Sequence, residues 1–423
     1  MIKFLPILIM FLLFAVNVPV GFSILISSVV YFVFIVTDMP MDLVIQALVG
    51  TSESFTMLAI PFFVTAGIVM SYGGVSESLL DLAEVLTGHM EGGLGQANVL
   101  LSTFMGGCSG SSAADCAFES KLLVPQMEKR GYSRGFSGAV TVASSVITPI
   151  IPPGICLIVY ATATNTSIGD MFLAGYVPGI ILCVALMVTV RIVAGKKGYG
   201  GHRARPTGRE ILHVLKKSVW ALLLPFGIIM GLRCGVFTAT ECGAITVLYS
   251  TLVGVFVYRK LKWEHVPKII VESILTTASV MLIMAAANVF ARYLALEQVP
   301  QAFAGFLVSN VNSKYVFLIL VNILMLITGM FLDSAAAMII LAPLLLPVAV
   351  RFGINPIHLG IIMCINDTIG GATPPVGMML FTCMSVTKMK MSEYIRDGWP
   401  FLVTLLIVLL LVTFIPGISL LLV

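Results

Sequence analysis

The chain has 423 residues, of which 59% are apolar and 10% are charged, and its mean hydropathy is +1.06. Soluble proteins carry about 25% charged residues, so this composition excludes a soluble protein and indicates one that lies in a lipid bilayer. At about 20 residues per span, the length leaves room for roughly ten to twelve spans and for no large soluble domain. The net charge of +4 is too small to indicate a nucleic-acid partner.

The apolar runs are long and continuous and lack the alternation of a membrane β-barrel, which predicts an all-α polytopic membrane protein. In chain order, the predicted spans lie at about 4–16, 20–36, 55–72, 136–161, 171–193, 218–233, 242–258, 270–293, 358–384 and 398–416. An acidic loop around Asp42 and an amphipathic helix at 76–91 are predicted between the early spans. The polar segment 194–217 is predicted to be a cytoplasmic linker.

The linker divides the chain into two halves, 1–193 and 218–423, that repeat each other. A shift of 222 positions without gaps aligns 107–153 with 329–375 at 12 identities, which include both Pro-Pro pairs. Composition alone would give about three or four identities over that length. Internal repeats are a common mark of transporter folds, so each half is predicted to be one structural repeat.

Basic residues predict how the repeats are oriented, because short loops rich in lysine and arginine stay in the cytoplasm. Of the 24 lysines and arginines, 19 lie in four segments, at 121–134, 191–217, 259–268 and 388–396. These segments reach one face only if the apolar regions at about 95–125 and 317–347 are re-entrant hairpins that enter from opposite sides. The N-terminus is then predicted to be periplasmic, and the second repeat runs inverted relative to the first.

Glycine and proline interrupt each half twice, once at a hairpin turn (106–112 or 329–334) and once inside the span at 136–161 or 358–384. A broken helix is tolerated in hydrocarbon only where it is buried in protein or lines a wet cavity. Carbonyls freed by unwinding can bind a small cation, and exposed helix N-termini favour an anion. At least two Na⁺ sites are therefore predicted, with ligands at Ser109, Ser111, Ser112, Thr148, Pro149, Gly329, Asp333, Gly370 and Thr373.

Acidic residues within apolar stretches point to function, because a charge is costly there. Contacts to an anionic substrate are predicted at Ser111, Asp115, Asp333 and Thr373. The alternatives are that a break is a plain kink and that Asp115 or Asp333 caps a helix. Catalytic pairs and zinc motifs are missing from the sequence, so an enzyme is not predicted. A channel is the other alternative, although no filter motif occurs.

The runs GGCSGSSAAD, ITPIIPPG, GMFLDSAAAMIILAPLLLPVAVRFGI and GGATPPVGMMLF resemble the large, DctM-like membrane subunit of tripartite ATP-independent periplasmic (TRAP) transporters, and the resemblance covers essentially the whole chain. It implies Na⁺-coupled uptake of an organic acid anion across a bacterial inner membrane by an elevator movement. It also implies a small four-helix DctQ-like membrane subunit and a periplasmic DctP-like binding protein as partners. Gly154 joins the expected substrate site, at a position where the family commonly has serine. A stand-alone Na⁺-coupled dicarboxylate carrier of a related inverted-repeat fold is the alternative.

Overall fold

The computed structural model describes residues 5–16, 18–35, 42–53, 55–107, 109–201, 204–233, 236–299, 305, 313–332 and 334–423, and these form only helices and their connections. The first half contains α1 (Leu5–Ala15), α2 (Val20–Val30), η2 (Tyr31–Ile35), α3 (Asp42–Glu53), η3 (Phe55–Leu58), α4 (Ala59–Tyr72), α5 (Val75–Thr87), α6 (Gly93–Gly106), α7 (Ser112–Leu122), α8 (Val124–Lys129), α9 (Arg134–Ser144), α10 (Ile155–Thr164) and α11 (Ile168–Lys197). The second half contains α12 (Gly208–Arg233), α13 (Ala239–Leu252), η4 (Val253–Val257), η5 (Trp263–His265), α14 (Val266–Leu296), α16 (Lys314–Phe331), α17 (Ser334–Arg351), α18 (Pro356–Ala372), α19 (Met378–Thr387), α20 (Met391–Phe414) and α21 (Pro416–Leu420).

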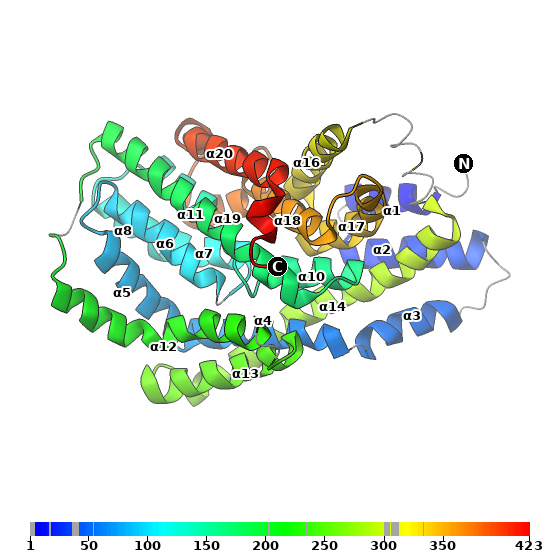
Figure 1. Ribbon diagram of the computed structural model, residues 1–423, viewed down its shortest axis with the longest axis horizontal. Coiled ribbons are helices and arrows are strands. Elements are labelled where there is room, and N and C mark those ends of the chain that lie inside the picture. The colour runs from blue at the N-terminus through cyan, green and yellow to red at the C-terminus, as the bar shows by residue number, and fades with distance from the viewer. Residues whose placement is uncertain are drawn as a thin grey trace.

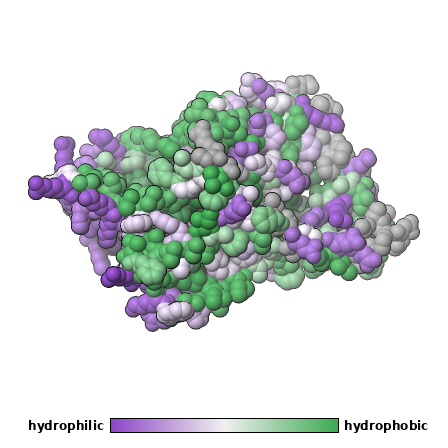
Figure 2. All heavy atoms as spheres, turned by 60° about the horizontal axis from the view of Figure 1, so that its bottom comes forward, coloured by the Kyte–Doolittle hydropathy of each residue, from purple (hydrophilic) through white to green (hydrophobic). Residues whose placement is uncertain are grey.

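Seven helices of the described ranges are long and apolar enough to cross a membrane, and α4 with α5, bent by 67°, form an eighth candidate. The longest, α11 and α14, each measure about 45 Å at the helical rise of 1.5 Å per residue. Hydrophobic side chains cover the middle of the molecule, and hydrophilic ones gather at its left end in Figure 2. The all-α, multi-span architecture predicted from composition is therefore confirmed.

Two sequence predictions need correction at the level of elements. The segment around Asp42, taken as an acidic loop, forms helix α3, which packs against α14. Among the described residues of the first predicted span, α1 has 11 residues, about 16 Å of helix, which is too short to cross a bilayer. Helix α11 extends to Lys197 and α12 begins at Gly208, so both helices reach into the segment 194–217, whose role as a cytoplasmic linker stays a prediction.

Both predicted helical hairpins and both predicted helix breaks are present. Helices α6 and α7 form the first hairpin, and α16 and α17 form the second. Helices α9 and α10 are the two parts of the first broken helix, and α18 and α19 are the parts of the second. In each broken helix the connection contains a Pro-Pro pair, whose missing N–H groups prevent the helix from continuing. Both Pro-Pro bonds are cis.

Helix packing follows the sequence repeat. The shift of 222 residues converts α7 into α17 and α10 into α19, and the structure packs α7 against α19 and α10 against α17. It likewise converts α2 into α13 and α4 into the second part of α14, and the structure packs α2 against α14 and α13 against α4. Exchanging the two halves turns the contact of α7 with α19 into that of α17 with α10, and the contact of α2 with α14 into that of α13 with α4. A two-fold axis between two inverted repeats requires this relation.

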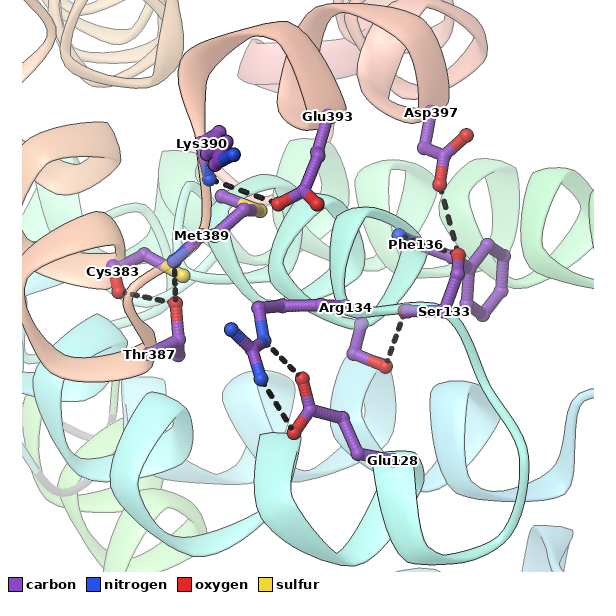
Figure 3. A network of polar contacts seen from close by, with 11 residues as sticks. Glu128, Ser133, Arg134, Phe136, Cys383, Thr387, Met389, Lys390, Glu393 and Asp397 are labelled. Atoms are coloured by element: carbon purple, nitrogen blue, oxygen red, sulfur yellow. Dashed lines mark hydrogen bonds and ion pairs between the residues drawn. The ribbon is translucent and has the colours of Figure 1, made fainter.

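All four basic segments meet at one end of the molecule. The Asp397 carboxylate is 4% exposed and pairs with Lys197 Nζ at 2.9 Å, and it accepts a hydrogen bond from Ser133 Oγ at 2.9 Å. Figure 3 shows this region, where α9 lies next to α20 and Arg134 pairs with Glu128. These contacts join the segments 121–134, 191–217 and 388–396.

The fourth basic segment joins the same end through α5. Lys217 Nζ and Lys260 Nζ each lie 2.7 Å from an acidic side chain of α5, Asp81 and Glu77 respectively. The tyrosine hydroxyl of Tyr258 also donates to the carbonyl of Lys217 at 3.1 Å. This arrangement places 259–268 beside 191–217, as the orientation prediction requires. We call this end of the molecule the basic end.

The helices form two groups that pack against each other (Figure 1). In the first group, α14 packs against α2, α3 and α4, and α13 packs against α4. The second group contains both hairpins and both broken helices, together with α11 and α20. Hairpin helix α17 contacts α14, and α10 contacts α4, so the second hairpin and the first broken helix lie where the groups meet. We call the first group the scaffold.

Candidate functional site

A cavity of about 150 Å³ lies between the two repeats, and both contribute residues to its lining. Its walls come from both hairpin turns, from both broken helices and from scaffold helix α14. The lining residues are Gly110, Ser111, Ser112, Ala113, Pro149, Ile155, Cys156, Thr276, Val280, Gly329, Leu332, Ser334, Ala335, Asp367, Thr368, Gly371, Met378 and Met379. We call it the central cavity.

Four helix N-termini point at the central cavity. The first residues of α7, α10, α17 and α19 all line it. The first N–H groups of a helix have no partner within the helix, and the helix dipole adds partial positive charge there. Asp367 is the only charged side chain among the described lining residues, so positive charge at this place comes from helix ends rather than from lysine or arginine.

Small residues allow the hairpin turns to approach the broken helices. In the first repeat, Gly110 has φ of +59°, and its carbonyl accepts a hydrogen bond from the Ile155 N–H at 3.3 Å. A side chain at Gly110 would collide with the carbonyl of Pro153. In the second repeat, a Cβ at Gly329 would lie 2.6 Å from the Asp367 carbonyl oxygen. Glycine is therefore required in both repeats where a turn meets its break.

A second cavity of about 280 Å³ lies between the first hairpin and the scaffold. It shares Ser111, Ile155 and Thr276 with the central cavity and extends to Ser71 and Glu272. Glu272 accepts a hydrogen bond from Tyr72 Oη at 2.7 Å, close to the basic segment 259–268. We call it the basic-side cavity.

Asp115 lines the basic-side cavity and is 1% exposed. Its Oδ2 accepts a hydrogen bond of 2.6 Å from Thr148 Oγ1, whereas its Oδ1 has no hydrogen-bond partner among the described residues. The hydroxyl of Ser109, which lines the same cavity, is also buried and has no partner in the described part of the chain. Two such oxygen atoms beside one cavity are suited to a cation, because buried acceptors need a partner.

Glu119 lies one turn after Asp115 on α7 and is fully buried, but its oxygens are occupied. Ser102 Oγ lies 2.8 and 2.9 Å from the two carboxylate oxygens, and Ser144 Oγ lies 3.3 Å from one of them. Ser144 also donates to Asn98 within the same cluster. Glu119 therefore holds α6, α7 and α9 together and is not among the described residues that line the central or the basic-side cavity.

A third cavity of about 340 Å³ lies at the other end of the scaffold. It is formed by α3, the second part of α14, the end of α10 and part of α17. The lining residues are Gly50, Thr51, Met57, Thr162, Ala163, Asn165, Met284, Ala287, Asn288, Ala291, Ile339 and Pro343. None of these residues lines the central cavity. We call it the far-side cavity.

The predicted site residues fall into three sets. Four of them line the central cavity: Ser111, Ser112, Pro149 and Gly329. Ser109 and Asp115 line the basic-side cavity, together with Ser111. Four others lie beside the breaks without lining either cavity: Thr148, Gly154, Gly370 and Thr373. Asp333 lies outside the residues that the structure describes.

The positions of that third set have local explanations. Thr148 bonds Asp115, and Gly370 packs against the main chain of Gly329. Thr373 Oγ1 donates to the carbonyl of Ile369 at 2.7 Å, within its own helix. A Cβ at Gly154 would collide with the carbonyl of Pro149, so the serine expected there from the family pattern would not fit this backbone.

Sequence reasoning missed the scaffold residues Thr276 and Val280. Both lie in an ordinary apolar helix, and only the packing of the two groups brings them to the cavity. It also gave little weight to Asp367, which is 2% exposed and lines the central cavity. The position of Asp367, three residues before Gly370 at the break, is the signal that could have identified it.

The profile of the family described as "Tripartite ATP-independent periplasmic transporter, DctM component" matches residues 7–418. The chain belongs to the DctM family. It is 42% identical over 370 residues to the C4-dicarboxylate TRAP transporter large permease protein DctM of Pseudomonas aeruginosa, covering 88% of this chain and 86% of that protein. It is 38% identical over 411 residues to the sialic acid TRAP transporter large permease protein SiaM of Vibrio cholerae, covering 97% and 96% of the two chains.

DctM membership makes this chain a transporter subunit and not an enzyme, and it agrees with the multi-span fold. The crystal structure of the Alcanivorax borkumensis YdaH transporter, described as having an unusual topology, has a related fold. It superposes with a TM-score of 0.63 at 15% identity and covers 89% of this chain and 88% of that one. This similarity concerns the fold alone.

Proposed function

We propose that the chain is the large membrane subunit of a Na⁺-coupled TRAP transporter that imports an organic acid anion into a bacterial cell. Two related permeases are named for C4-dicarboxylates and for sialic acid, and both of these substrates carry carboxylate groups. These names support a carboxylate as the transported substrate. The membrane is then the inner membrane, with the basic end in the cytoplasm and the N-terminus in the periplasm.

The observation that carries this proposal is the charge pattern of the central cavity. Four helix N-termini favour an anion there, but each contributes only a partial charge. The one charged side chain among the described lining residues, Asp367, would repel a carboxylate. A buried anion without a full positive partner is costly, so a cation bound nearby would complete the site. This requirement couples anion binding to Na⁺.

Oxygen atoms near the central cavity supply the Na⁺ ligands of this proposal. Candidates in the first repeat are the hydroxyls of Ser109 and Ser111 and the freed carbonyls around Pro149. In the second repeat, Asp367 and the main chain at Gly329 are the equivalents. We assign Asp115, first predicted as a substrate contact, to the cation, because its Oδ1 has no hydrogen-bond partner among the described residues and a carboxylate oxygen is a better ligand for a cation than for an anion.

Two partners belong to the proposal, a small DctQ-like membrane subunit and a periplasmic DctP-like binding protein that delivers the anion. The description of the family as a tripartite periplasmic transporter supports both. The binding protein would select the acid, because the central cavity offers helix ends and hydroxyls rather than a set of charged side chains. The division into a scaffold and a hairpin-bearing group supports an elevator movement, in which the second group moves along the first.

The test is uptake into liposomes that contain all three components, with a panel of labelled dicarboxylates, sugar acids and sulfonates. An inward Na⁺ gradient should drive accumulation of at least one acid, and an equal K⁺ gradient should not. Uptake at full rate without Na⁺ would contradict the coupling. Uptake without the small subunit and binding protein would instead support a stand-alone carrier.

A further inference from the structure

One ridge of side chains on scaffold helix α14 lines all three cavities in succession. Thr276 lines both the basic-side and the central cavity, and Val280 lines the central cavity. Met284 and Asn288 line the far-side cavity. Residues four apart are neighbours on a helix surface, so these side chains form a continuous ridge that winds by about 120° around the axis from Thr276 to Asn288. Thr276 and Asn288 are separated by about 18 Å along the axis at 1.5 Å per residue.

The basic-side and far-side cavities are lined in part by scaffold helices that the sequence repeat relates to each other. Glu272 lines the first, and Gly50, which the 222-residue shift aligns with it, lines the second. The first cavity uses α4 and the first part of α14, and the second uses α3 and the last part of α14. The two cavities therefore lie against scaffold helices that the repeat relates, and Glu272 and Gly50 are the one aligned pair among their described lining residues.

Among the described residues, the central cavity borders one of these two cavities. It shares three lining residues with the basic-side cavity and none with the far-side cavity, among the residues described. A carrier built from two inverted repeats reaches its opposite state when the repeats exchange their conformations. In that opposite state the hairpin turns would lie beside the part of α14 that now lines the far-side cavity.

We propose that Asn288, held by Thr51, is the scaffold side chain that faces the substrate site in the opposite state, as Thr276 does in the described state. Asn288 Nδ2 donates to Thr51 Oγ1 at 2.8 Å and lies 3.4 Å from the Ala47 carbonyl. Thr51 is 3% exposed and therefore fixes the amide from α3. Asn288 is thus the polar contact of α14 in the far-side cavity, in a helix face that is otherwise apolar there. This inference rests on the proposed elevator movement.

Cross-linking between paired cysteines tests this proposal. The eight native cysteines are replaced, and Ala113→Cys on the first hairpin is combined in turn with Thr276→Cys, Val280→Cys, Met284→Cys and Asn288→Cys. Ser279→Cys is the matched control, because Ser279 is exposed on α14 and lines none of the three cavities. A short bifunctional thiol reagent is added to the complete transporter in liposomes, with and without labelled substrate and Na⁺.

Cross-links at Thr276 and Val280 are expected without turnover, and cross-links at Met284 and Asn288 are expected to appear during turnover. Ser279 should react in neither condition. The inference would be overturned if no cross-link formed at Met284 or Asn288 during turnover. It would also be overturned if Ser279 cross-linked as strongly as these positions. If the cross-links move to Met284 and Asn288 while uptake does not depend on Na⁺, this inference is supported and the proposed coupling to Na⁺ is contradicted.

A single substitution in the native-cysteine background provides a second readout. Asn288→Ala should lower the maximal uptake rate about tenfold and leave the Na⁺ concentration for half-maximal uptake unchanged, because Asn288 does not line the central cavity in the described state. Asn288→Gln, which keeps the amide, should recover part of the rate. An unchanged rate in Asn288→Ala would overturn the proposal.

Discussion

Gly329 lies where α16 crosses α18, at the base of the second hairpin turn. A Cβ at this position would meet the carbonyl oxygen of Asp367 at 2.6 Å, and one at Gly370 would lie 2.8 Å from Gly329 itself. Main-chain atoms cannot move aside as flexible side chains do, so any larger residue must separate the two helices. The same pair of helices carries Asp367 into the central cavity.

We therefore expect Gly329→Ala to reduce uptake at least tenfold and to lower the thermal midpoint of unfolding in detergent. Gly227→Ala is the matched control, because Gly227 is also a helical glycine but has no atom within 4 Å of its added Cβ. The control should be neutral or stabilising, since alanine is favoured over glycine in a helix by about 1 kcal/mol. Normal uptake by Gly329→Ala would contradict the close approach described here.

Asp115 and Glu119 are two buried carboxylates on one helix with different surroundings. We expect Asp115→Asn to raise the Na⁺ concentration for half-maximal uptake about tenfold, because it removes a full negative charge beside the proposed cation. A tenfold change corresponds to about 1.4 kcal/mol of binding free energy. Glu119→Gln should leave the Na⁺ dependence unchanged, because its oxygens bond serines rather than face a cavity. Equal effects of both substitutions would contradict the assignment.

At the scale of elements, Asp397 joins helices from both halves at the basic end. Its carboxylate connects α20 to Lys197 at the end of α11 and to Ser133 at the start of α9. Ser133 also caps α9 by accepting a hydrogen bond from the Phe136 N–H at 3.2 Å (Figure 3). The side chain is 4% exposed, so water cannot easily replace these partners.

Asp397→Ala is accordingly expected to reduce the free energy of unfolding by about 2 kcal/mol, because it leaves partly buried polar groups without an acceptor. Asp81→Ala is the control, because Asp81 pairs with Lys217 while both side chains are more than half exposed. Exposed ion pairs contribute less than about 1 kcal/mol. Thermal unfolding of the purified variants in detergent measures both changes, and an equal loss in the two would contradict this account of the basic end.

At the scale of the whole molecule, the sequence predicted the elements that glycine and proline define. The first hairpin, expected at about 95–125, runs from the start of α6 at Gly93 to the end of α7 at Leu122. The repeat located both Pro-Pro breaks, because those residues prevent helix continuation wherever they occur.

Contacts between elements that are distant in the sequence could not be predicted from glycine and proline positions. Helix α3 was missed because its 12 residues mix acidic, polar and apolar side chains and gain their stability from packing on α14. Thr276 and Asn288 carry no local signal, since one polar residue in an apolar helix is common. Their importance comes from the cavities that they line at two levels of α14.

The central claim is that the anion and Na⁺ enter together through the site formed by both repeats. The most direct test measures radiolabelled Na⁺ and a labelled organic acid entering the same liposomes, which contain the chain with its small subunit and binding protein. We predict that the two uptakes rise together at a fixed ratio of at least two Na⁺ per anion and that both fall in Asp115→Asn. Anion entry that proceeds at full rate while no Na⁺ enters would contradict the account.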